Sequence, residues 1–359
     1  MAKVLMKGNE AVAEASIRSG CRLYFAYPIT PQSELIEYMA RMMPKVGGTF
    51  LQAESEVAAI NMVYGAAGTG KRVMTSSSSP GISLKMEGIS YLAGANLPAV
   101  IINVQRGGPG LGDIQPAQGD YFQATKGGGH GDYRLIVLAP ASVQEFADMA
   151  SESFDLADKY RIPVMILSDG MLGQMMEPVE FKKAATDAEI EEMGNRHKEW
   201  CIHPQEEGEA YHQNQINSLE IDPTVLEKHV MKLDEKYKLI EKNEIQVEEY
   251  NINSNNEMIC VAFGTASRIV KSAIDKLNAE GRNIGLIRPI TVWPYPYATI
   301  AKSLHDKVKK VMVFELNLGQ MVEDVRLAVN GKVPVGFFGK VGGIVFTPEE
   351  IKAQIEENL

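Results

Sequence analysis

The sequence predicts an α/β protein with a doubly wound parallel sheet, an acidic helical connector and a smaller α/β domain. Over residues 1–181, short Val, Ile and Leu runs alternate with Ala-rich helical stretches, as in a sheet covered by helices. Residues 182–255 are acidic and poor in strand-like runs, and the alternation resumes over residues 256–359. We therefore expect two α/β domains joined by the connector.

Five apolar runs in the first part are predicted to be strands: Arg22–Ala26, Arg72–Ser76, Ala99–Val104, Leu135–Ala139 and Val164–Ser168. Their side chains do not alternate between apolar and polar, which suits parallel strands that are buried on both faces. Helices are expected between them, at Gly8–Ser19, Ser55–Gly68 and Ser142–Lys159.

The predicted connector carries the charge imbalance of the chain. Between Asp187 and Glu249 there are 17 Asp and Glu residues against 7 Lys and Arg residues, a balance of −10 that equals the net charge of the whole sequence. Within it, apolar residues recur at helical spacing at Leu226, Val230, Leu233, Tyr237 and Ile240. Because this repeat is short, a helix packed on its own chain is favoured over a coiled coil with a partner.

The last part repeats the α/β pattern on a smaller scale. A strand at Met258–Phe263 is followed by a predicted turn at 264–266 and a helix at Ser267–Glu280. Further strands are expected at Asn283–Arg288 and Lys310–Glu315, and a closing helix from Pro348.

Composition narrows the class of protein. A chain of 359 residues with 45% hydrophobic side chains can bury a substantial core. It has no apolar run of about 18 residues and no signal-peptide pattern, so we expect a cytoplasmic protein without membrane contact. A net charge of −10 argues against nucleic acid as a partner. Its three cysteines are far apart and form no Cys-x-x-Cys pair, so no disulfide framework or iron–sulfur site is expected in this chain.

One block of sequence carries recognisable chemistry. Glu56 opens an Ala-rich helix, Gly70-Lys71 follows it, and after a short strand comes the Ser-rich stretch Ser76–Gly81. In this order and spacing the block resembles the pyrimidine-binding domain of thiamine-diphosphate enzymes. The alternative is that Glu56 is an ordinary first-turn glutamate, which the helix dipole favours.

The resemblance implies a catalytic role for Glu56. A carboxyl group beside the N1' nitrogen of the aminopyrimidine promotes the imino tautomer, which then removes the proton from the thiazolium carbon. The carboxyl group must hold a proton near neutrality for this, and apolar neighbours such as Val57 and Ile60 favour the uncharged form.

A second set of motifs narrows the resemblance. Tyr27-Pro28-Ile29-Thr30-Pro31 follows the first strand, and Gln105-Arg106-Gly-Gly-Pro-Gly-Leu-Gly follows the third. With Gly8-Asn9-Glu10-Ala11 and Gln118-Gly119-Asp120-Tyr121, these resemble the α subunit of the 2-oxoacid:ferredoxin oxidoreductases, closest to the branched-chain 2-oxoisovalerate type. The resemblance covers almost the whole chain and implies a thiamine-diphosphate pyrimidine-binding domain and a transketolase-C-terminal-like domain.

The family pattern assigns roles to individual residues. It implies that Thr30 and Arg106 bind the substrate carboxylate, for which a guanidinium and a hydroxyl are suitable donors. It places cofactor contacts at Pro28, Ile29, Glu56 and Ser79. Two alternatives stay open, namely that Thr30 only caps the next helix ahead of Pro31 and that Arg106 is a surface loop arginine.

The sequence departs from the family pattern at two places. Gln32 stands where Ser is more usual, which bears on substrate fit, and Ser77-Ser-Ser-Pro-Gly81 replaces the commoner Thr-Ser-Gly-Pro-Gly, which bears on the loop that faces the cofactor. His130, within Gly127–Asp132, is either an acid–base group or a loop residue. The sequence alone does not decide between these two roles of His130.

Missing motifs indicate a division of labour among subunits. The sequence has no Gly-Asp-Gly motif for the Mg²⁺ ion that holds the cofactor diphosphate, so no metal site is expected in this chain. The resemblance implies a thiamine-diphosphate-binding β subunit, a γ subunit and a ferredoxin-like subunit with [4Fe-4S] clusters. Together they would convert a 2-oxoacid and coenzyme A to acyl-CoA and CO₂ and pass electrons to ferredoxin.

Other functions remain open at this point. A non-oxidative thiamine-diphosphate enzyme half and a non-catalytic scaffold subunit are the alternatives. Leu111 and Ile114 favour a branched aliphatic substrate, but pyruvates with aryl groups and 2-oxoglutarate are not excluded. Subunit stoichiometry, and whether the small domain binds coenzyme A, are also undetermined by the sequence.

Overall fold

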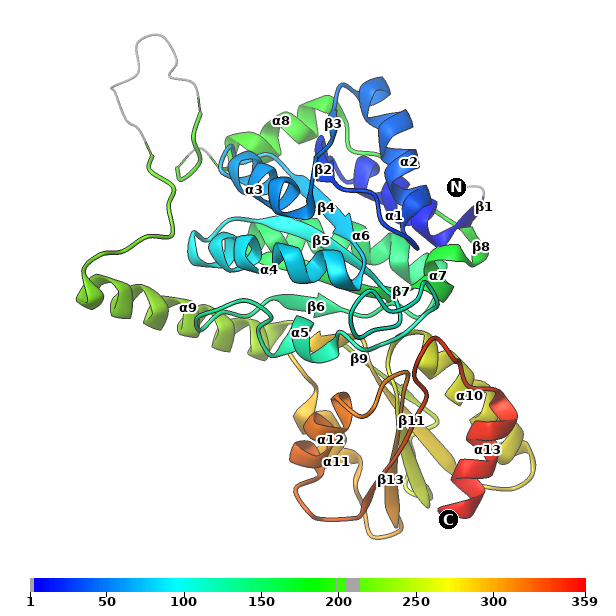
Figure 1. Cartoon of the computed structure of the whole chain (residues 1–359). Helices are drawn as coiled ribbons and strands as arrows, with labels where there is room; N and C mark the ends of the chain where they lie inside the picture. Colours follow the sequence, from blue (N-terminus) through cyan, green and yellow to red (C-terminus); the bar gives the residue numbers. More distant parts are fainter. Residues whose placement is uncertain (1–2, 198, 204–213) are drawn as a thin grey trace.

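A computed structural model describes residues 3–197, 199–203 and 214–359 of the chain. Two sheets dominate it, a seven-stranded sheet and a five-stranded sheet that lie one above the other in Figure 1. A short antiparallel pair, β1 (Val4–Lys7) with β8 (Met176–Val179), joins the two ends of the first part of the chain. No helix in the described part of the chain is long and apolar enough to cross a membrane.

The large sheet confirms the five predicted strands. Its order is β12-β6-β7-β5-β4-β2-β3, and all neighbours are parallel except β12 and β6. The strands are β2 (Leu23–Ala26), β3 (Thr49–Gln52), β4 (Val73–Ser77), β5 (Ala99–Gln105), β6 (Ile136–Leu138), β7 (Pro163–Asp169) and β12 (Thr291–Trp293). β3 was not predicted from the sequence, because it is an edge strand that is largely exposed and lacks an apolar run.

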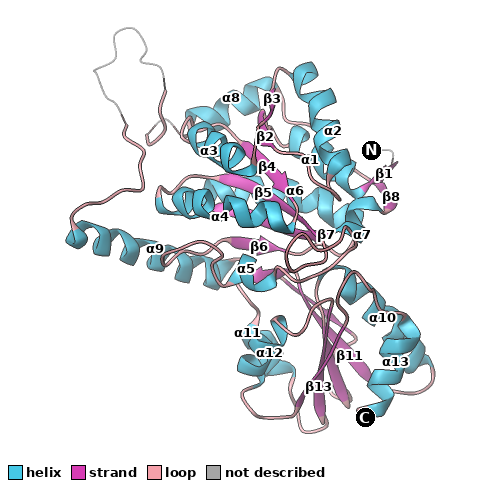
Figure 2. Cartoon of the chain, viewed as in Figure 1, coloured by secondary structure: helices cyan, strands magenta, loops and turns pink. Residues whose placement is uncertain are grey.

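Helices cover both faces of this sheet (Figure 2). α1 (Gly8–Arg18) packs on α6 (Val143–Tyr160), and α3 (Glu56–Ala67) packs on α4 (Ser79–Gly94) on the other face. Shorter helices lie near the ends of the strands, at α2 (Ser33–Met42), the 3-10 helix η1 (Met43–Val46), α5 (Tyr121–Thr125) and α7 (Gly170–Gln174).

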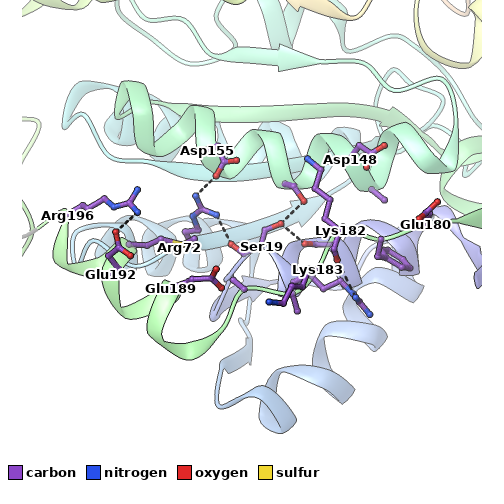
Figure 3. Close-up of a pocket in the computed structure, with 18 residues that line it drawn as sticks. Ser19, Arg72, Asp148, Asp155, Glu180, Lys182, Lys183, Glu189, Glu192 and Arg196 are labelled. Atoms are coloured by element: carbon purple, nitrogen blue, oxygen red, sulfur yellow. Dashed lines mark hydrogen bonds and ion pairs between the residues drawn. The ribbon is translucent and has the colours of Figure 1, made fainter. Parts of the chain in front are cut away.

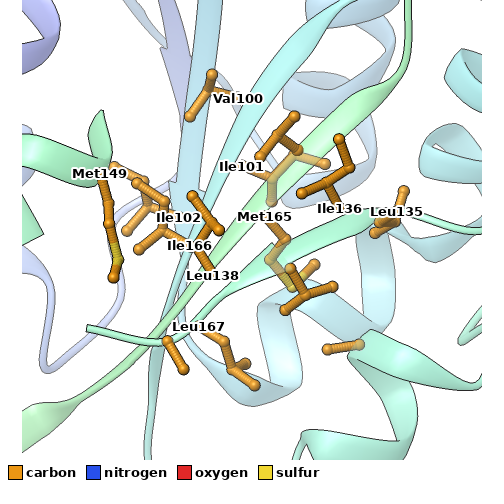
Figure 4. Close-up of a cluster of buried hydrophobic side chains, with 14 of the residues drawn as sticks. Val100, Ile101, Ile102, Leu135, Ile136, Leu138, Met149, Met165, Ile166 and Leu167 are labelled. Carbon is orange, nitrogen blue, oxygen red and sulfur yellow. The ribbon is translucent and has the colours of Figure 1, made fainter. Parts of the chain in front are cut away.

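The core of the large sheet is apolar and completely enclosed (Figure 4). Strands β5, β6 and β7 contribute side chains that are at most 3% exposed, and α6 adds Met149. The residues labelled in Figure 4 are Val100, Ile101, Ile102, Leu135, Ile136, Leu138, Met149, Met165, Ile166 and Leu167. Their burial explains the unbroken apolar runs of these strands.

The small sheet has the order β14-β13-β10-β11-β9. Its strands are β9 (Val247–Tyr250), β10 (Met258–Val261), β11 (Ile284–Pro289), β13 (Lys310–Glu315) and β14 (Val335–Gly339). α10 (Gly264–Ala279) packs on α13 (Pro348–Glu357), and α11 (Tyr297–Ser303) packs on α12 (Met321–Val329). The two pairs lie on opposite sides of the sheet in Figure 1.

The turn predicted at residues 264–266 is wrong. α10 begins directly at Gly264, whose φ of +53° lies in the left-handed region that glycine adopts without strain. The chain therefore changes direction at Gly264 alone, and Thr265 and Ala266 already belong to the helix.

The predicted connector contains α8 (Asp187–Asn195) and α9 (Pro223–Asn243), and its residues 204–213 lie outside the described part. In α9, Leu233, Tyr237 and Ile240 are buried, whereas Leu226 is 41% exposed, so only the second half of the apolar stripe packs on the chain. β9 also falls within these residues and pairs with β11. The domain bounds at 181 and 255 remain a prediction.

Two groups of contacts connect the sheets. Gln118 exchanges hydrogen bonds with the small domain at Phe263, Leu316 and Asn317, with distances of 2.8–3.1 Å. Arg288, which is 3% exposed, donates two hydrogen bonds to Glu145 on α6 (2.7 and 2.9 Å) and one to Glu248 on β9 (2.7 Å). The loop that follows β5 is therefore fixed at its far end by the small domain.

We predict that Arg288→Met lowers the free energy of unfolding by about 1–3 kcal/mol, because a buried cation is removed from two carboxylates that are only about one-third exposed. Lys276→Met, which breaks the exposed pair between Lys276 and Glu349, is the control and is expected to cost less than about 1 kcal/mol. Urea denaturation of the full chain measures both. Equal losses would contradict the account.

Candidate active site

The residues singled out from the sequence lie at one edge of the large sheet. Loops leave the carboxyl ends of the adjacent parallel strands β3, β2, β4 and β5 there, and open α/β sheets bind ligands at this edge. Glu56 follows β3, Thr30 follows β2, Ser79 follows β4 and Arg106 follows β5. The fold therefore brings four separate motifs to neighbouring positions.

Glu56 is the first residue of α3 and is 7% exposed. Ser55 caps the helix by accepting a hydrogen bond from the Ala58 amide at 3.2 Å, which fixes the backbone on which Glu56 lies. The first turn of α4 approaches it so closely that a Cβ at Gly81 would lie 2.7 Å from Glu56 Oε1 and 2.1 Å from Ser77 Oγ. Any side chain at position 81 would therefore have to displace the side chain of Ser77 or Glu56.

Arg106 and Thr30 lie in contact. Arg106 donates from Nη1 to the Thr30 carbonyl at 3.0 Å and from Nη2 to the Leu111 carbonyl at 2.9 Å. Its Nε is buried and has no partner among the described residues, and the Thr30 side chain is exposed. The helix-cap alternative for Thr30 is wrong, because α2 begins at Ser33 with Gln32 at the capping position.

Ser79 connects two of these loops. Its hydroxyl donates to Asp120 Oδ2 at 2.6 Å and accepts from the Arg106 backbone amide at 3.0 Å. Asn103 donates to the same carboxylate oxygen at 2.8 Å, and burial raises the pKa of Asp120. Asp120 therefore fixes the side chain of Ser79, and Ser79 fixes the backbone of Arg106. No separate role for Asp120 was predicted from the sequence.

The segment Tyr27–Thr30 leaves β2 at the surface, with Pro28 exposed and Ile29 partly buried. Gln32 behind it is completely buried. It donates to the Tyr27 carbonyl at 3.4 Å and accepts from the Ser76 hydroxyl, which also bonds Tyr24 at 2.6 Å. Gln32 therefore supports the loop from behind, which gives this departure from the family pattern a structural role.

Lys85 is the most unusual residue near the site and was missed in the sequence. It lies on α4, is 0% exposed, and donates to Thr75 Oγ1 at 2.7 Å and to the Ser76 carbonyl at 2.9 Å. Burial lowers its pKa to about 7, and the nearby Glu56 opposes part of this effect. A sign in the sequence that Lys85 is buried is its position beside the apolar residues Ile82, Met86 and Ile89, which recur at helical spacing.

His130 does not join this group. It is exposed, its Nδ1 lies 3.5 Å from Ser90 Oγ, and its ring meets the ring of Tyr91 edge to face. Ser90 is nine residues beyond Gly81 on α4, which corresponds to about 14 Å along the helix. This separation indicates that His130 is a loop residue and not an acid–base group beside Glu56.

A polar hollow of about 440 Å³ lies at the opposite edge of the sheet, between α1, α6 and α8 (Figure 3). Arg72, just before β4, pairs there with Asp155 at 2.6 Å and Asp158 at 2.8 Å, and Arg196 pairs with Glu192 at 2.9 Å. Because its arginines already pair with carboxylates, this hollow is a weaker candidate for a ligand-binding site than the edge that carries Glu56. No cluster of three metal-binding side chains occurs within residues 3–197, 199–203 and 214–359.

Comparison with known proteins defines the family. Residues 14–249 match the model described as pyruvate flavodoxin/ferredoxin oxidoreductase, thiamine diP-binding, and residues 256–351 match core domain II of pyruvate:ferredoxin oxidoreductase. The chain is 48% identical to the ketoisovalerate oxidoreductase subunit VorB of Methanothermobacter thermautotrophicus, over 99% of this chain and 98% of that protein. It is 36% identical to the 2-oxoglutarate synthase subunit KorA of Methanocaldococcus jannaschii, over 98% of both.

Solved structures support the fold. A 2-oxoglutarate:ferredoxin oxidoreductase from Magnetococcus marinus matches with a TM-score of 0.85 and 29% identity over 99% of this chain. The chain covers 65% of the length of that protein. A split-gene transketolase matches 98% of this chain and 97% of its own with a TM-score of 0.58 at 12% identity, which shows a common fold alone.

The family match and the fold define a thiamine-diphosphate-binding protein of the oxidoreductase class. More particularly, the chain belongs to the pyruvate flavodoxin/ferredoxin oxidoreductase family and is a subunit of a 2-oxoacid:ferredoxin oxidoreductase, closest to the branched-chain type. The predicted resemblance is confirmed.

The geometry fits the pyrimidine half of the cofactor. A buried carboxyl group is packed against Gly81, and the hydroxyls of Ser77 and Ser78 are buried without a partner in the described chain. Polar atoms of this kind require a partner, and a heterocycle with donor and acceptor nitrogens provides one. The residues present are therefore compatible with the cofactor.

We predict that Gly81→Ala lowers thiamine-diphosphate-dependent activity of the assembled complex by about 100-fold, because the new methyl group must displace the Glu56 carboxyl or the Ser77 hydroxyl. Gly65→Ala is the matched control, since a Cβ at this α3 position meets nothing within 4 Å. Cofactor titration and steady-state kinetics measure the effect. Full activity in both variants would show that position 81 does not constrain Glu56.

Proposed function

We propose that this chain is the α subunit of an enzyme that oxidatively decarboxylates 2-oxoisovalerate to an acyl-CoA and CO₂ and passes the electrons to ferredoxin. The observation that carries the proposal is the convergence of buried Glu56 with the contacting pair Arg106 and Thr30 at one sheet edge. The 48% identity to a ketoisovalerate oxidoreductase subunit supports the choice of substrate.

Glu56 is proposed as the catalytic residue of this chain. Its carboxyl group is enclosed by α4 and would meet the N1' nitrogen of the pyrimidine, with Pro28, Ile29 and Ser79 supporting the ring from the neighbouring loops. Bound thiamine diphosphate supplies a nucleophilic carbon and an electron sink for decarboxylation. Glu56 is only 7% exposed, so its carboxyl group would meet the cofactor where water is largely excluded.

Arg106 and Thr30 are proposed to bind the carboxylate of the substrate. Two backbone carbonyls hold the guanidinium in place, and its Nε still lacks a partner among the described residues. A fixed guanidinium recognises a carboxylate with little loss of conformational entropy, and the exposed Thr30 hydroxyl is a second donor beside it. The hydrogen bonds among Asp120, Ser79 and the Arg106 amide fix the position of the loop that carries Arg106.

The side chain of the substrate is proposed to face the apolar part of the same loop. Leu111, whose carbonyl accepts from Arg106, is 81% exposed, and Ile114 is 55% exposed. A branched aliphatic group gains from contact with these apolar residues, whereas a second carboxylate gains nothing from them. This favours 2-oxoisovalerate over 2-oxoglutarate.

The remaining components are proposed to come from other chains. The β subunit would bind the diphosphate through Mg²⁺, a ferredoxin-like subunit would hold the [4Fe-4S] clusters, and a γ subunit would complete the enzyme. Coenzyme A and ferredoxin are the further reactants. The proposal rests on the subunit names of the relatives and on the Gly-Asp-Gly motif that this sequence lacks.

We predict that Glu56→Ala abolishes coenzyme-A-dependent reduction of a viologen dye, by at least about 100-fold, because the cofactor loses its activating carboxyl group. The assay uses the chain co-expressed with its genomic neighbours and compares 2-oxoisovalerate, pyruvate and 2-oxoglutarate, the first of which should be preferred. Glu54→Ala removes an exposed carboxylate two residues away and should retain activity.

Two outcomes would favour the alternatives. A complex that contains cofactor and iron but acts on no 2-oxoacid would contradict the proposal and favour a non-oxidative thiamine-diphosphate enzyme. Full activity in the Glu56→Ala complex would favour a scaffold role for this chain.

For Arg106→Met we predict a rise in KM for the 2-oxoacid of about 10–100-fold with unchanged affinity for thiamine diphosphate, because one charge-assisted contact to the substrate is lost. Arg41→Met, at an exposed arginine near the end of α2, is the control. Steady-state kinetics and cofactor titration separate the two quantities. A change in cofactor affinity alone would place Arg106 at the cofactor instead.

A further inference from the structure

Lys85 is a fully buried lysine for which the reaction described above has no use. It donates to Thr75 and to the Ser76 carbonyl on β4, and no carboxylate forms an ion pair with it in the described ranges 3–197, 199–203 and 214–359. Removing an ammonium group from water without a counter-ion is costly, so a lysine in this position calls for a specific reason.

The packing of α3 on α4 places Lys85 behind Glu56. Gly81 meets Glu56, and a Cβ at Gly88 would lie 2.6 Å from Ile60. Residues 81, 85 and 88 share one face of α4, and residues 56 and 60 share one face of α3, because neighbours on a helix surface are three or four positions apart. Lys85 therefore lies on α4 between the two contacts of this helix pair, about one turn beyond the residue that meets Glu56.

The two groups influence each other through charge. Burial is the larger effect on the pKa of Lys85 and lowers it to about 7, while the Glu56 carboxylate acts in the opposite direction. The charge of Lys85 therefore changes near neutral pH within reach of Glu56. A cation there favours the carboxylate form of Glu56, and a neutral amine does not.

The other titratable groups around the pair are accounted for. Tyr24 on β2 bonds Ser76, and burial raises its pKa far above neutrality, so it stays uncharged. Asp120, ahead of α5, accepts from Ser79 and Asn103. Arg106 after β5 bonds the Thr30 and Leu111 carbonyls. Among these residues, Lys85 is the cation on α4 whose pKa burial lowers to about 7.

We propose that Lys85 is a positioning residue that acts on Glu56 through its charge and makes cofactor binding at this site depend on pH. The inference rests on the proposed function, because it assumes that Glu56 meets the pyrimidine nitrogen of thiamine diphosphate. It adds a residue to which no role in the reaction has been given.

The first measurement tests whether Lys85 titrates near neutrality, and it needs no cofactor. The pKa of Lys85 in the folded chain, about 7, lies below the value of about 10.4 for an unfolded lysine, so the unfolded chain binds more protons between these pH values. Raising the pH from 7 to 10 should therefore stabilise the wild-type chain relative to Lys85→Met. If the unfolding midpoints of the wild type and of Lys85→Met change equally with pH over this range, the proposal is overturned.

The second measurement tests the coupling to Glu56. Affinity of the assembled complex for thiamine diphosphate, with Mg²⁺ present, is followed by calorimetry as a function of pH. The affinity of the wild-type complex should depend on pH over the range in which Lys85 changes charge. Removing the cation should shift this pH dependence by about one unit, since a unit charge within several ångströms has this effect at an effective dielectric constant near 20.

Two neutral replacements guard against a folding defect. Lys85→Met keeps the volume of the side chain, and Lys85→Gln keeps a donor for Thr75 and the Ser76 carbonyl, so both should shift the profile in the same direction. Lys71→Met, at an exposed lysine after α3, should coincide with the wild type. Profiles of both Lys85 variants that coincide with the wild type would overturn the role of Lys85 while leaving the proposed function intact.

Failure of the proposed function gives a different result. A wild-type complex that binds no thiamine diphosphate, or whose binding is indifferent to Glu56→Ala, would overturn both proposals together.

Discussion

The close approach of α4 to α3 is the constraint on which the site depends. Glu56 packs at the start of α3 against a residue without a side chain, and a methyl group at position 81 would have to displace the side chain of Ser77 or Glu56. Lys85 lies about one turn further along α4, and the Ser77 hydroxyl has no partner in the described chain. One contact between two helices thus fixes the position and the electrostatic setting of the proposed catalytic residue.

The opposite side of the site depends on contacts that are distant in sequence. Asp120 and Ser79 hold the backbone of Arg106, and Gln118 ties the end of the same loop to the small domain at Phe263 and Leu316. Arg288 strengthens this junction. The small domain therefore contributes to the proposed substrate site by fixing one of its loops, whether or not it also binds a ligand.

The central strands of both sheets and the positions of Glu56, Thr30 and Arg106 were predictable, because apolar runs and local motifs determine them. The strands β1, β3, β8, β9, β12 and β14 were not predicted; β3, for example, is an exposed edge strand, and β12 pairs with β6, more than 150 residues away in the sequence. Lys85 looks like a surface residue in the sequence. Its burial, like the contact between Asp120 and Ser79, follows only from tertiary packing.

The central claim is that Glu56 meets the pyrimidine ring of thiamine diphosphate at the edge of the large sheet. A structure of the assembled complex with the cofactor bound tests it most directly. The account predicts a Glu56 carboxyl oxygen at hydrogen-bond distance, about 2.7–3.0 Å, from the N1' nitrogen of the pyrimidine. A pyrimidine ring held by another chain, with Glu56 facing protein atoms alone, would contradict it.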